Sequence, residues 1–169
     1  MIRKDREVGN QDEIYDILKR FDTIKIAMLG DVYPYIVPVS FGIEVVDGKT
    51  VIYFHCAQKG TKIELIKENP HVCVEGEIFI QIEKTSHGIT ARYESVIGFG
   101  ECTFVTKQEE IIHGMKLLTE HYGYDEYPLD SCAGLNHLFV GKIVLNEIYG
   151  KKNLPGTLTP ADRAANDLT

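Results

Sequence analysis

No apolar run in this sequence approaches the ~20 residues that a membrane-spanning helix needs. The opening segment, MIRKDREVGN, is charged and lacks the apolar core of a secretory signal peptide. Basic residues number only 18 against 25 acidic ones, and the resulting net charge of −7 repels a phosphate backbone on average. We therefore expect a soluble, cytoplasmic protein that has neither a membrane nor a nucleic acid as partner.

The usual signatures of metal, nucleotide and hydrolase sites are also missing. The six histidines form no H-E-x-x-H or H-x₃-H pattern and the four cysteines form no C-x-x-C, so no metal site is expected. In a chain without a secretion signal, Cys56, Cys73, Cys102 and Cys132 are interpreted as reduced, mostly buried thiols. The absence of P-loop, G-x-G-x-x-G and G-x-S-x-G patterns leaves Walker, Rossmann and serine-hydrolase sites without support.

The apolar spacing predicts one domain built mainly from strands, since 169 residues suit a single domain. Helical spacing occurs at 11–21, at 61–67 and from Thr106 to Gly123, where Thr106 and Glu109 have the spacing of a capping box. Runs rich in Ile, Val, Tyr and Phe predict six strands, at residues 24–29, 35–45, 50–56, 71–83, 89–105 and 137–149. This order favours a mainly β (α+β) fold, an antiparallel barrel with appended helices. Residues 154–169 are expected to form a tail outside a domain of residues 1–153.

The stretch 59–62 places two lysines around a glycine where a strand gives way to a helix. Thr61 and Glu64 have the spacing of a capping box, which predicts a helix start at this point. Because a helix start carries free N–H groups and partial positive charge, Lys59, Gly60, Thr61 and Lys62 form a candidate anion site. The alternative reading is a solvated turn in which Thr61 only caps the helix.

Two other stretches carry a functional and a structural reading. Pro38 lies inside a strand-like run, where it marks an edge, a bulge or a strand end; exposed main chain there would hydrogen-bond a planar ligand. Arg92 is a second candidate anion contact, and Gly98 and Gly100 indicate either close approach of a ligand or a bulge in a long, bent strand. By residues alone, the bulge is the better interpretation of the stretch around Gly98 and Gly100, and a bulge is the alternative interpretation of the stretch around Pro38.

Five segments in a fixed order resemble one protein family. They are KDRE, YPYIVPVSFG, YFHCAQKGTKIELIKENPHVCVE, RYESVIGFGE and GKIVLNEIYGKK. This order resembles the pyridoxamine 5′-phosphate oxidase-related flavin-binding split barrels, and within them the nitroimidazole-resistance (Nim-type) branch. The resemblance covers residues 1–153 and implies a six-stranded antiparallel split β-barrel that forms a homodimer with FMN at the subunit interface.

The resemblance also assigns roles to residues of this chain. It implies that the loop after the YFH strand binds the flavin phosphate, that the VPVSF backbone lies along the ring, and that the RYESVIGFG strand faces the flavin, from either subunit. His55 matches a histidine that the Nim-type branch places near the ring, so it is the candidate catalytic residue. The implied cofactor-binding residues are Pro38, Val39, Ser40, His55, Cys56, Ala57, Lys59, Gly60, Thr61, Lys62, Arg92, Tyr93, Ser95 and Val96.

The implied activity is that of an FMN-dependent oxidoreductase, which passes electrons from reduced flavin to a small planar acceptor such as a nitroimidazole. The chain has no tryptophan and no arginine-rich C-terminal segment, so synthesis of vitamin B6 is not expected. A clamp made mainly of lysines also accommodates FAD or a deazaflavin. Two alternatives remain at this point: a flavin store or redox sensor without turnover, and a haem-binding split barrel with His55 or His137 as axial ligand.

Overall fold

The computed structural model describes residues 3–86 and 88–156. Three α-helices and three short 3₁₀ helices accompany one sheet: η1 (Lys4–Arg6), α1 (Gln11–Leu18), α2 (Thr61–Glu68), α3 (Gln108–His121), η2 (Leu129–Ser131) and η3 (Ala133–His137). The strands are β1 (Glu7–Val8), β2 (Ile24–Met28), β3 (Tyr35–Val39), β4 (Gly42–Val46), β5 (Lys49–Ala57), β6 (His71–Thr85), β7 (Gly88–Phe104) and β8 (Leu138–Asn153).

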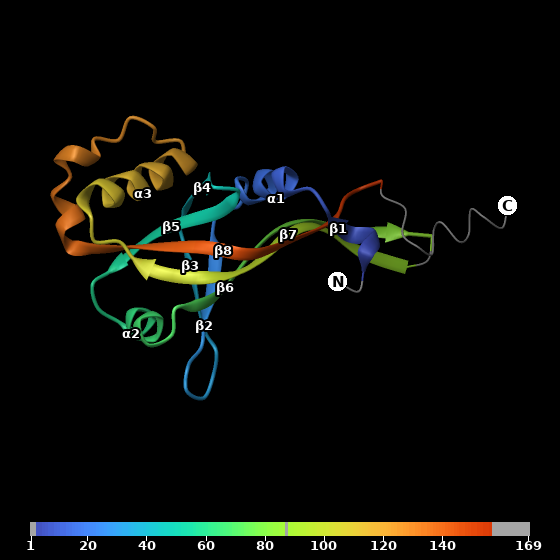
Figure 1. Ribbon diagram of the computed structural model, residues 1–169. Helices are drawn as coiled ribbons and strands as arrows, with labels where there is room; N and C mark the ends of the chain where they lie inside the picture. Colours follow the sequence, from blue (N-terminus) through green and yellow to red (C-terminus); the bar gives the residue numbers. More distant parts are fainter. Residues whose placement is uncertain (1–2, 87, 157–169) are drawn as a thin grey trace.

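All strand pairs are antiparallel, and the sheet runs in the order β3-β2-β6-β7-β8-β5-β4, with β1 added to β8. The sheet curls into a split barrel, with α3 over β4 and β5, α2 at the end of β5, and α1 near the opposite end of that strand (Figure 1). The predicted antiparallel split barrel with three helices is therefore confirmed. None of the helices among the described residues is both long and apolar enough to cross a membrane.

The number of strands differs from the prediction of six. The predicted strand 35–45 is two strands, because the chain leaves β2 at Ser40 and joins β5 from Gly42 onward, at the other end of the sheet order. Tyr122 fixes this crossing: its hydroxyl accepts a hydrogen bond from the Phe41 N–H at 3.3 Å and donates one to the Asp22 carbonyl at 2.6 Å. The other strand that was not predicted is β1. It has only two residues, too few to show an alternating pattern in the sequence.

Two further differences concern the last strand and the third helix. β8 continues to Asn153, beyond the predicted end at residue 149, because β1 and β7 pair with its final residues. The capping box expected at Thr106 and Glu109 is wrong, since α3 begins after Lys107 and has no side-chain cap. The bulge interpretation of the β7 glycines is confirmed by a register shift against β8 between Phe99 and Gly100. The predicted tail lies mostly outside the described residues, which end at Gly156.

Apolar side chains pack into two clusters on opposite faces of β5. One fills the barrel and includes Ile52 and Phe54, both of which are fully buried. The other lies beneath α3 and includes Val51 and Tyr53. Neighbouring residues of a strand point to opposite faces, so β5 separates the barrel interior from the α3 layer along its whole buried length.

Gly42 sets how closely α3 approaches the sheet. A Cβ at this position would collide with backbone atoms of Leu117 and Leu118, which cannot move aside as a side chain can. We expect Gly42→Ala to lower the free energy of unfolding by about 1–3 kcal/mol, the usual cost of overpacking. Urea denaturation measures this, with Gly9→Ala as the matched control because nothing lies within 4 Å of its added Cβ. Equal stability of the two variants would contradict the close packing of α3 on β4.

Candidate functional site

The loop between β5 and α2 opens onto a helix start that no side chain caps. Gly60 is the N-cap, with φ of 133°, a conformation that favours glycine. Within the described part of the chain, the N–H groups of Thr61 and Lys62 have no acceptor, whereas those of Ile63 and Glu64 bond to the Gly60 carbonyl. The capping box predicted at Thr61 is therefore wrong, because Thr61 is the first helical residue. Because the Thr61 side chain does not cap the helix, the free N–H groups at the helix N-terminus remain available to an anion.

A hollow of about 220 Å³ lies in front of this helix start. Three elements form its walls: β3, the end of β5, and the loop that leads into α2. The residues that line it are Tyr35, Val37, Cys56, Ala57, Lys59, Gly60, Thr61, Lys62 and Ile63. The structure thus brings together six of the predicted cofactor-binding residues, between apolar walls on one side and cationic groups on the other.

The two lysines of the loop differ in placement. Lys59 is exposed, whereas Lys62 is partly buried, and its Nζ lies 5.2 Å from the centre of the Phe54 ring. Neither lysine has a carboxylate within ion-pair distance among the described residues. In a chain of net charge −7, two cations without acidic partners beside free N–H groups favour an anionic ligand.

His55 and Cys56 point to opposite faces of β5, as the sequence predicts for adjacent strand residues. Cys56 packs against the barrel cluster and lines the hollow, while His55 is exposed and does not line it. Although part of its surface is exposed, the neighbouring protein atoms desolvate the His55 ring and lower its pKa, and the charge of Lys62 lowers it further, so the neutral imidazole predominates at pH 7. Burial raises the pKa of Cys56 and Lys62 only partly offsets this, so the thiol stays protonated. The arrangement does not activate Cys56 as a nucleophile.

The predicted ring-binding stretch lies on β3, whose outer edge pairs with no strand in the described sheet. Pro38 opposes Lys25 of β2, in agreement with the expected edge position, whereas the alternative of a bulge is wrong because the register with β2 is regular from Tyr35 to Val39. Val39 is buried and Ser40 is exposed beyond the strand end. The hollow is lined instead by Tyr35 and Val37, which sequence reasoning missed. The two-residue period of a strand could have identified them, because it places Tyr35, Val37 and Val39 on one face.

The remaining predicted residues lie far from this hollow. Ala57 opposes Leu138 at the start of β8, whereas Tyr93 opposes Asn153 at its end. At about 3.3 Å per residue, these two points are roughly 50 Å apart along β8. Arg92 and Val96 are buried, and Tyr93 and Ser95 lie on the other face of β7. One FMN molecule bound to the loop cannot reach these residues within the same chain.

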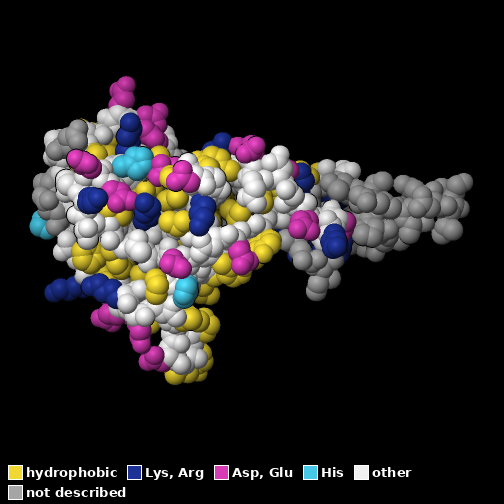
Figure 2. Space-filling view, in the orientation of Figure 1, with side chains coloured by type: hydrophobic (Ala, Val, Ile, Leu, Met, Phe, Trp, Pro, Cys, Tyr) yellow, Lys and Arg dark blue, Asp and Glu magenta, His cyan; other side chains and the backbone are white. Residues whose placement is uncertain are grey.

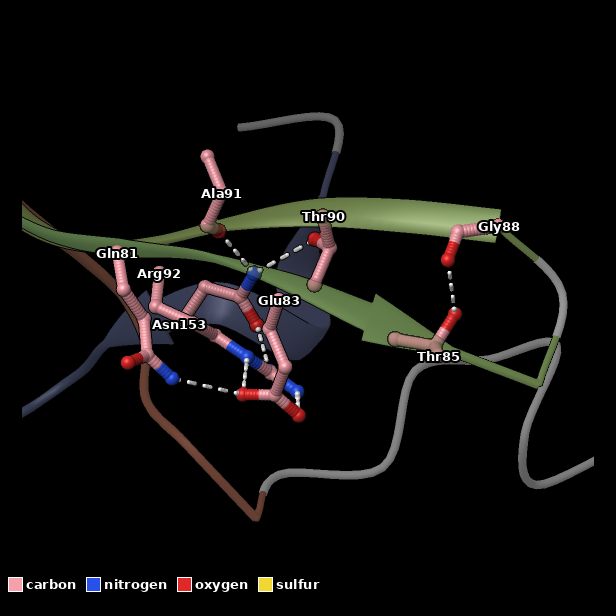
Figure 3. Close-up of polar contacts among 8 residues, drawn as sticks. All are labelled: Gln81, Glu83, Thr85, Gly88, Thr90, Ala91, Arg92 and Asn153. Atoms are coloured by element: carbon pink, nitrogen blue, oxygen red, sulfur yellow. Dashed lines mark hydrogen bonds and ion pairs between the residues drawn. The ribbon is translucent and has the colours of Figure 1, made fainter.

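Arg92 has a structural environment of its own (Figure 3). Its side chain is 2% exposed. The guanidinium donates two hydrogen bonds to Glu83, both 2.9 Å long, and a third to Asn153 Oδ1, also 2.9 Å long. The Asn153 amide donates in turn to the Thr90 hydroxyl at 3.1 Å and to the Ala91 carbonyl at 2.6 Å. Arg92 therefore ties β6 and β7 to the end of β8, and its role as a flavin contact stays a prediction.

Comparison with known proteins agrees with this fold. The sequence matches the model of the family described as Pyridoxamine 5′-phosphate oxidase over residues 10–152. A search of curated proteins found no match.

Three similar solved structures come from different bacteria. A Bacteroides thetaiotaomicron VPI-5482 protein, described as a candidate 5-nitroimidazole antibiotic resistance protein, has a TM-score of 0.75 and 24% identity, over 86% of this chain and 85% of that one. The FAD and haem binding protein from Mycobacterium smegmatis has a TM-score of 0.74 and 16% identity, over 95% and 80%. The flavocytochrome Anf3 from Azotobacter vinelandii has a TM-score of 0.72 and 13% identity, over 94% and 74%.

The match over residues 10–152 spans every described strand from β2 to β7 and nearly all of β8. It includes the β5–α2 loop and the hollow in front of it. The chain belongs to the pyridoxamine 5′-phosphate oxidase family.

Proposed function

We propose that this protein binds a flavin, FMN in the first instance, and passes electrons from the reduced flavin to a small planar acceptor of the nitroimidazole type. The observation that carries the proposal is the hollow at the β5–α2 loop. It combines two lysines that have no acidic partner among residues 3–86 and 88–156, free N–H groups at the start of α2, and apolar walls from β3 and β5. A flavin requires an anion clamp at one end and a flat, mainly apolar slot at the other.

The residues present fit that requirement. Lys59, Lys62 and the N–H groups at the start of α2 would hold the phosphate, and the unpaired edge of β3 would offer main-chain groups to the ring. When bound, the flavin supplies the electron-transfer chemistry itself. The chain's own contribution is to bind and orient it, which explains why the site needs few acid–base groups.

We further propose that the site is completed by a second copy of the chain. The hollow of about 220 Å³ is smaller than the roughly 300–1,000 Å³ of sites that enclose a small molecule. A second protomer would bring its own Tyr93 and Ser95, which lie on the outer face of β7, to the flavin of the first. A homodimer thus reconciles the two groups of predicted residues that lie roughly 50 Å apart along β8.

The similar structures support a flavin and leave its type to experiment. One is named for FAD and haem, one is a flavocytochrome, and one is described as a candidate nitroimidazole resistance protein. Lysines act as point charges rather than bidentate forks, so the clamp also accommodates FAD or a deazaflavin.

Haem binding is the second candidate function, because two of these relatives are named for haem or cytochrome. His55 and His137 are exposed and lie at the same end of the sheet, where β5 meets the start of β8.

A flavin store or redox sensor without turnover is the third candidate function, and it would use the same β5–α2 loop. Turnover kinetics separate the store from the enzyme.

His55 provides the test of turnover. We expect reduced protein, mixed anaerobically with a 5-nitroimidazole, to be reoxidised, and His55→Ala to slow this step by about 100-fold while flavin affinity is unchanged. That is the lower end of what a positioned acid–base group contributes, and because His55 does not line the hollow, it requires an acceptor that reaches the outer side of β5. Stopped-flow absorbance follows the reoxidation, with His113→Ala on α3 as the matched histidine control. Wild-type protein that is never reoxidised by the nitro compound would contradict the proposed reaction, and equal rates for the two proteins would leave His55 without a role in turnover.

A further inference from the structure

The hairpin of β6 and β7 extends beyond the rest of the sheet as a two-stranded arm. Pairing of β7 with β8 ends at Tyr93, whereas β6 and β7 remain paired to Thr85 and Gly88. We call residues 79–86 and 88–93 the arm; it is the ribbon that runs away from the body on the right of Figure 1. A two-stranded ribbon is marginally stable by itself in water, so this arm depends on contacts beyond its own two strands.

One face of the arm is supported within the chain. Arg92, Glu83 and Asn153 form the buried network described above, and Gln81 adds a hydrogen bond of 3.4 Å from its amide to Glu83 (Figure 3). These contacts make the arm a stiff projection of the sheet.

The other face of the arm is mainly apolar, and it is open except at Tyr93, where the Arg6 guanidinium lies 6.0 Å from the ring centre. The register places Phe79 opposite Tyr93, Ile82 opposite Ala91, and Ile89 opposite Lys84. Phe79 is 61% exposed, Ile82 59% and Ile89 78%. Such a row of large apolar side chains marks an interaction surface.

This apolar row continues onto the body of the sheet. Alternation along β7 puts Ile97 and Phe99 on the same face as Ile89, and both are more than 40% exposed. At the far end of that face lies a mainly apolar groove of about 360 Å³, whose walls include Leu29, Pro34, Cys73 and Phe99. Figure 2 shows hydrophobic side chains gathered at the lower end of the molecule, where Figure 1 places the β2–β3 loop.

One chain therefore carries an apolar projection and an apolar groove at opposite ends of one continuous face. A two-fold interface uses the same patch on both subunits, so that each projection can enter the other subunit's groove. Charge does not oppose this pairing, because Lys25 on the same face forms ion pairs with Glu75 and Glu77. The match between projection and groove selects a second copy of this chain as the occupant.

We propose that the arm of each protomer packs across the second copy, with Ile82 and Ile89 seated in the groove beside Leu29, Cys73 and Phe99. The proposal rests on the two-subunit site of the proposed function and specifies how the subunits hold each other. Arg92 then acts on the interface indirectly, because it stiffens the arm.

Cross-linking tests the seating directly. We expect Ile89→Cys to be joined by a short bismaleimide to Cys73 of the second copy, giving a covalent dimer on a denaturing gel. The covalent dimer should disappear in Ile89→Cys/Cys73→Ser. Val45→Cys is the matched control, since Val45 is an exposed aliphatic residue (53%) on β4, away from the arm. The seating would be overturned if the thiol introduced by Ile89→Cys reacts with the reagent without forming the dimer, or forms it equally well without Cys73.

A second pair of variants tests the arm without any cross-link. Ile82→Glu/Ile89→Glu leaves the isolated chain intact, because both side chains are exposed in it. We expect sedimentation to show a dimer weakened by about 100-fold or more, since two carboxylates would move from water into an apolar groove, and only the one at position 89 would have a lysine, Lys84, beside it. Val45→Glu should leave the dimer unchanged, and an undiminished dimer in the double variant would overturn the proposal. A dimer that depends on the arm in a protein that takes up no flavin would support the arm and contradict the proposed function.

Discussion

Replacing Lys59 and Lys62 together with alanine should remove most of the protein's affinity for FMN. In the proposed site, each lysine would supply a charge-assisted hydrogen bond to the phosphate, worth about 1.5–3 kcal/mol, or a factor of about 10–150 in Kd. We expect the single variants to show such losses and the double variant to lose flavin during gel filtration. Fluorescence titration of the apoprotein with FMN measures the affinities.

The two lysines should not respond identically. Lys59 is exposed and contacts no ring or carboxylate among the described residues, whereas Lys62 lies above Phe54 and alters the pKa of His55 and Cys56. Lys62→Ala should therefore raise the pKa of His55 toward its ordinary value, a change that Lys59→Ala should not produce. The control is Lys67→Ala, in the last turn of the same helix. An FMN affinity that survives the double substitution would remove the loop from the site.

Replacing Arg92 with methionine should cause the largest loss of stability. Removing one partner of a buried ion pair typically costs about 3–5 kcal/mol, because the other charge stays buried. Glu83 is 29% exposed, so water screens part of its charge and the expected loss is about 3 kcal/mol. Urea unfolding monitored by circular dichroism measures the change.

A comparison with another arginine separates burial from charge in this result. Arg3 pairs with Asp5 at 2.8 Å, but its side chain is 43% exposed. Arg3→Met should leave the unfolding midpoint unchanged. Equal behaviour of the two variants would show that Arg92 is not held in a buried network. A wild-type midpoint combined with lost FMN affinity in Arg92→Met would restore Arg92 as a direct flavin contact.

The sequence predicts the parts of this structure that depend on local patterns. Alternating residues locate the long strands, and the Lys-Gly-Thr-Lys loop falls where β5 meets α2. Local spacing could not show that residues 35–45 divide at Ser40, because the division follows from pairing with β2 on one side and β5 on the other. The two predicted capping boxes are wrong because each helix start is displaced by one residue: Gly60 and not Thr61 is the N-cap of α2, and Lys107 and not Thr106 is the N-cap of α3.

The candidate site shows the same limit. Lys59, Gly60, Thr61 and Lys62 are contiguous, so one motif reveals them together, whereas Tyr35 and Val37 enter the hollow only because the barrel closes. From the sequence, Arg92 is a candidate anion contact because no other arginine lies between Arg20 and Arg163. Its partners, Glu83 and Asn153, come from β6 and β8, and their positions depend on a register that a single sequence does not specify.

The absorption spectrum of the protein as purified, with mass analysis of what acid releases from it, tests the central claim most directly. A flavin held at the β5–α2 loop predicts the two visible and near-ultraviolet bands of an oxidised flavin and about one released FMN per chain. FAD or a deazaflavin in its place would keep the clamp and change the cofactor. A Soret band would favour haem, and a colourless protein that also takes up no added FMN would contradict the account.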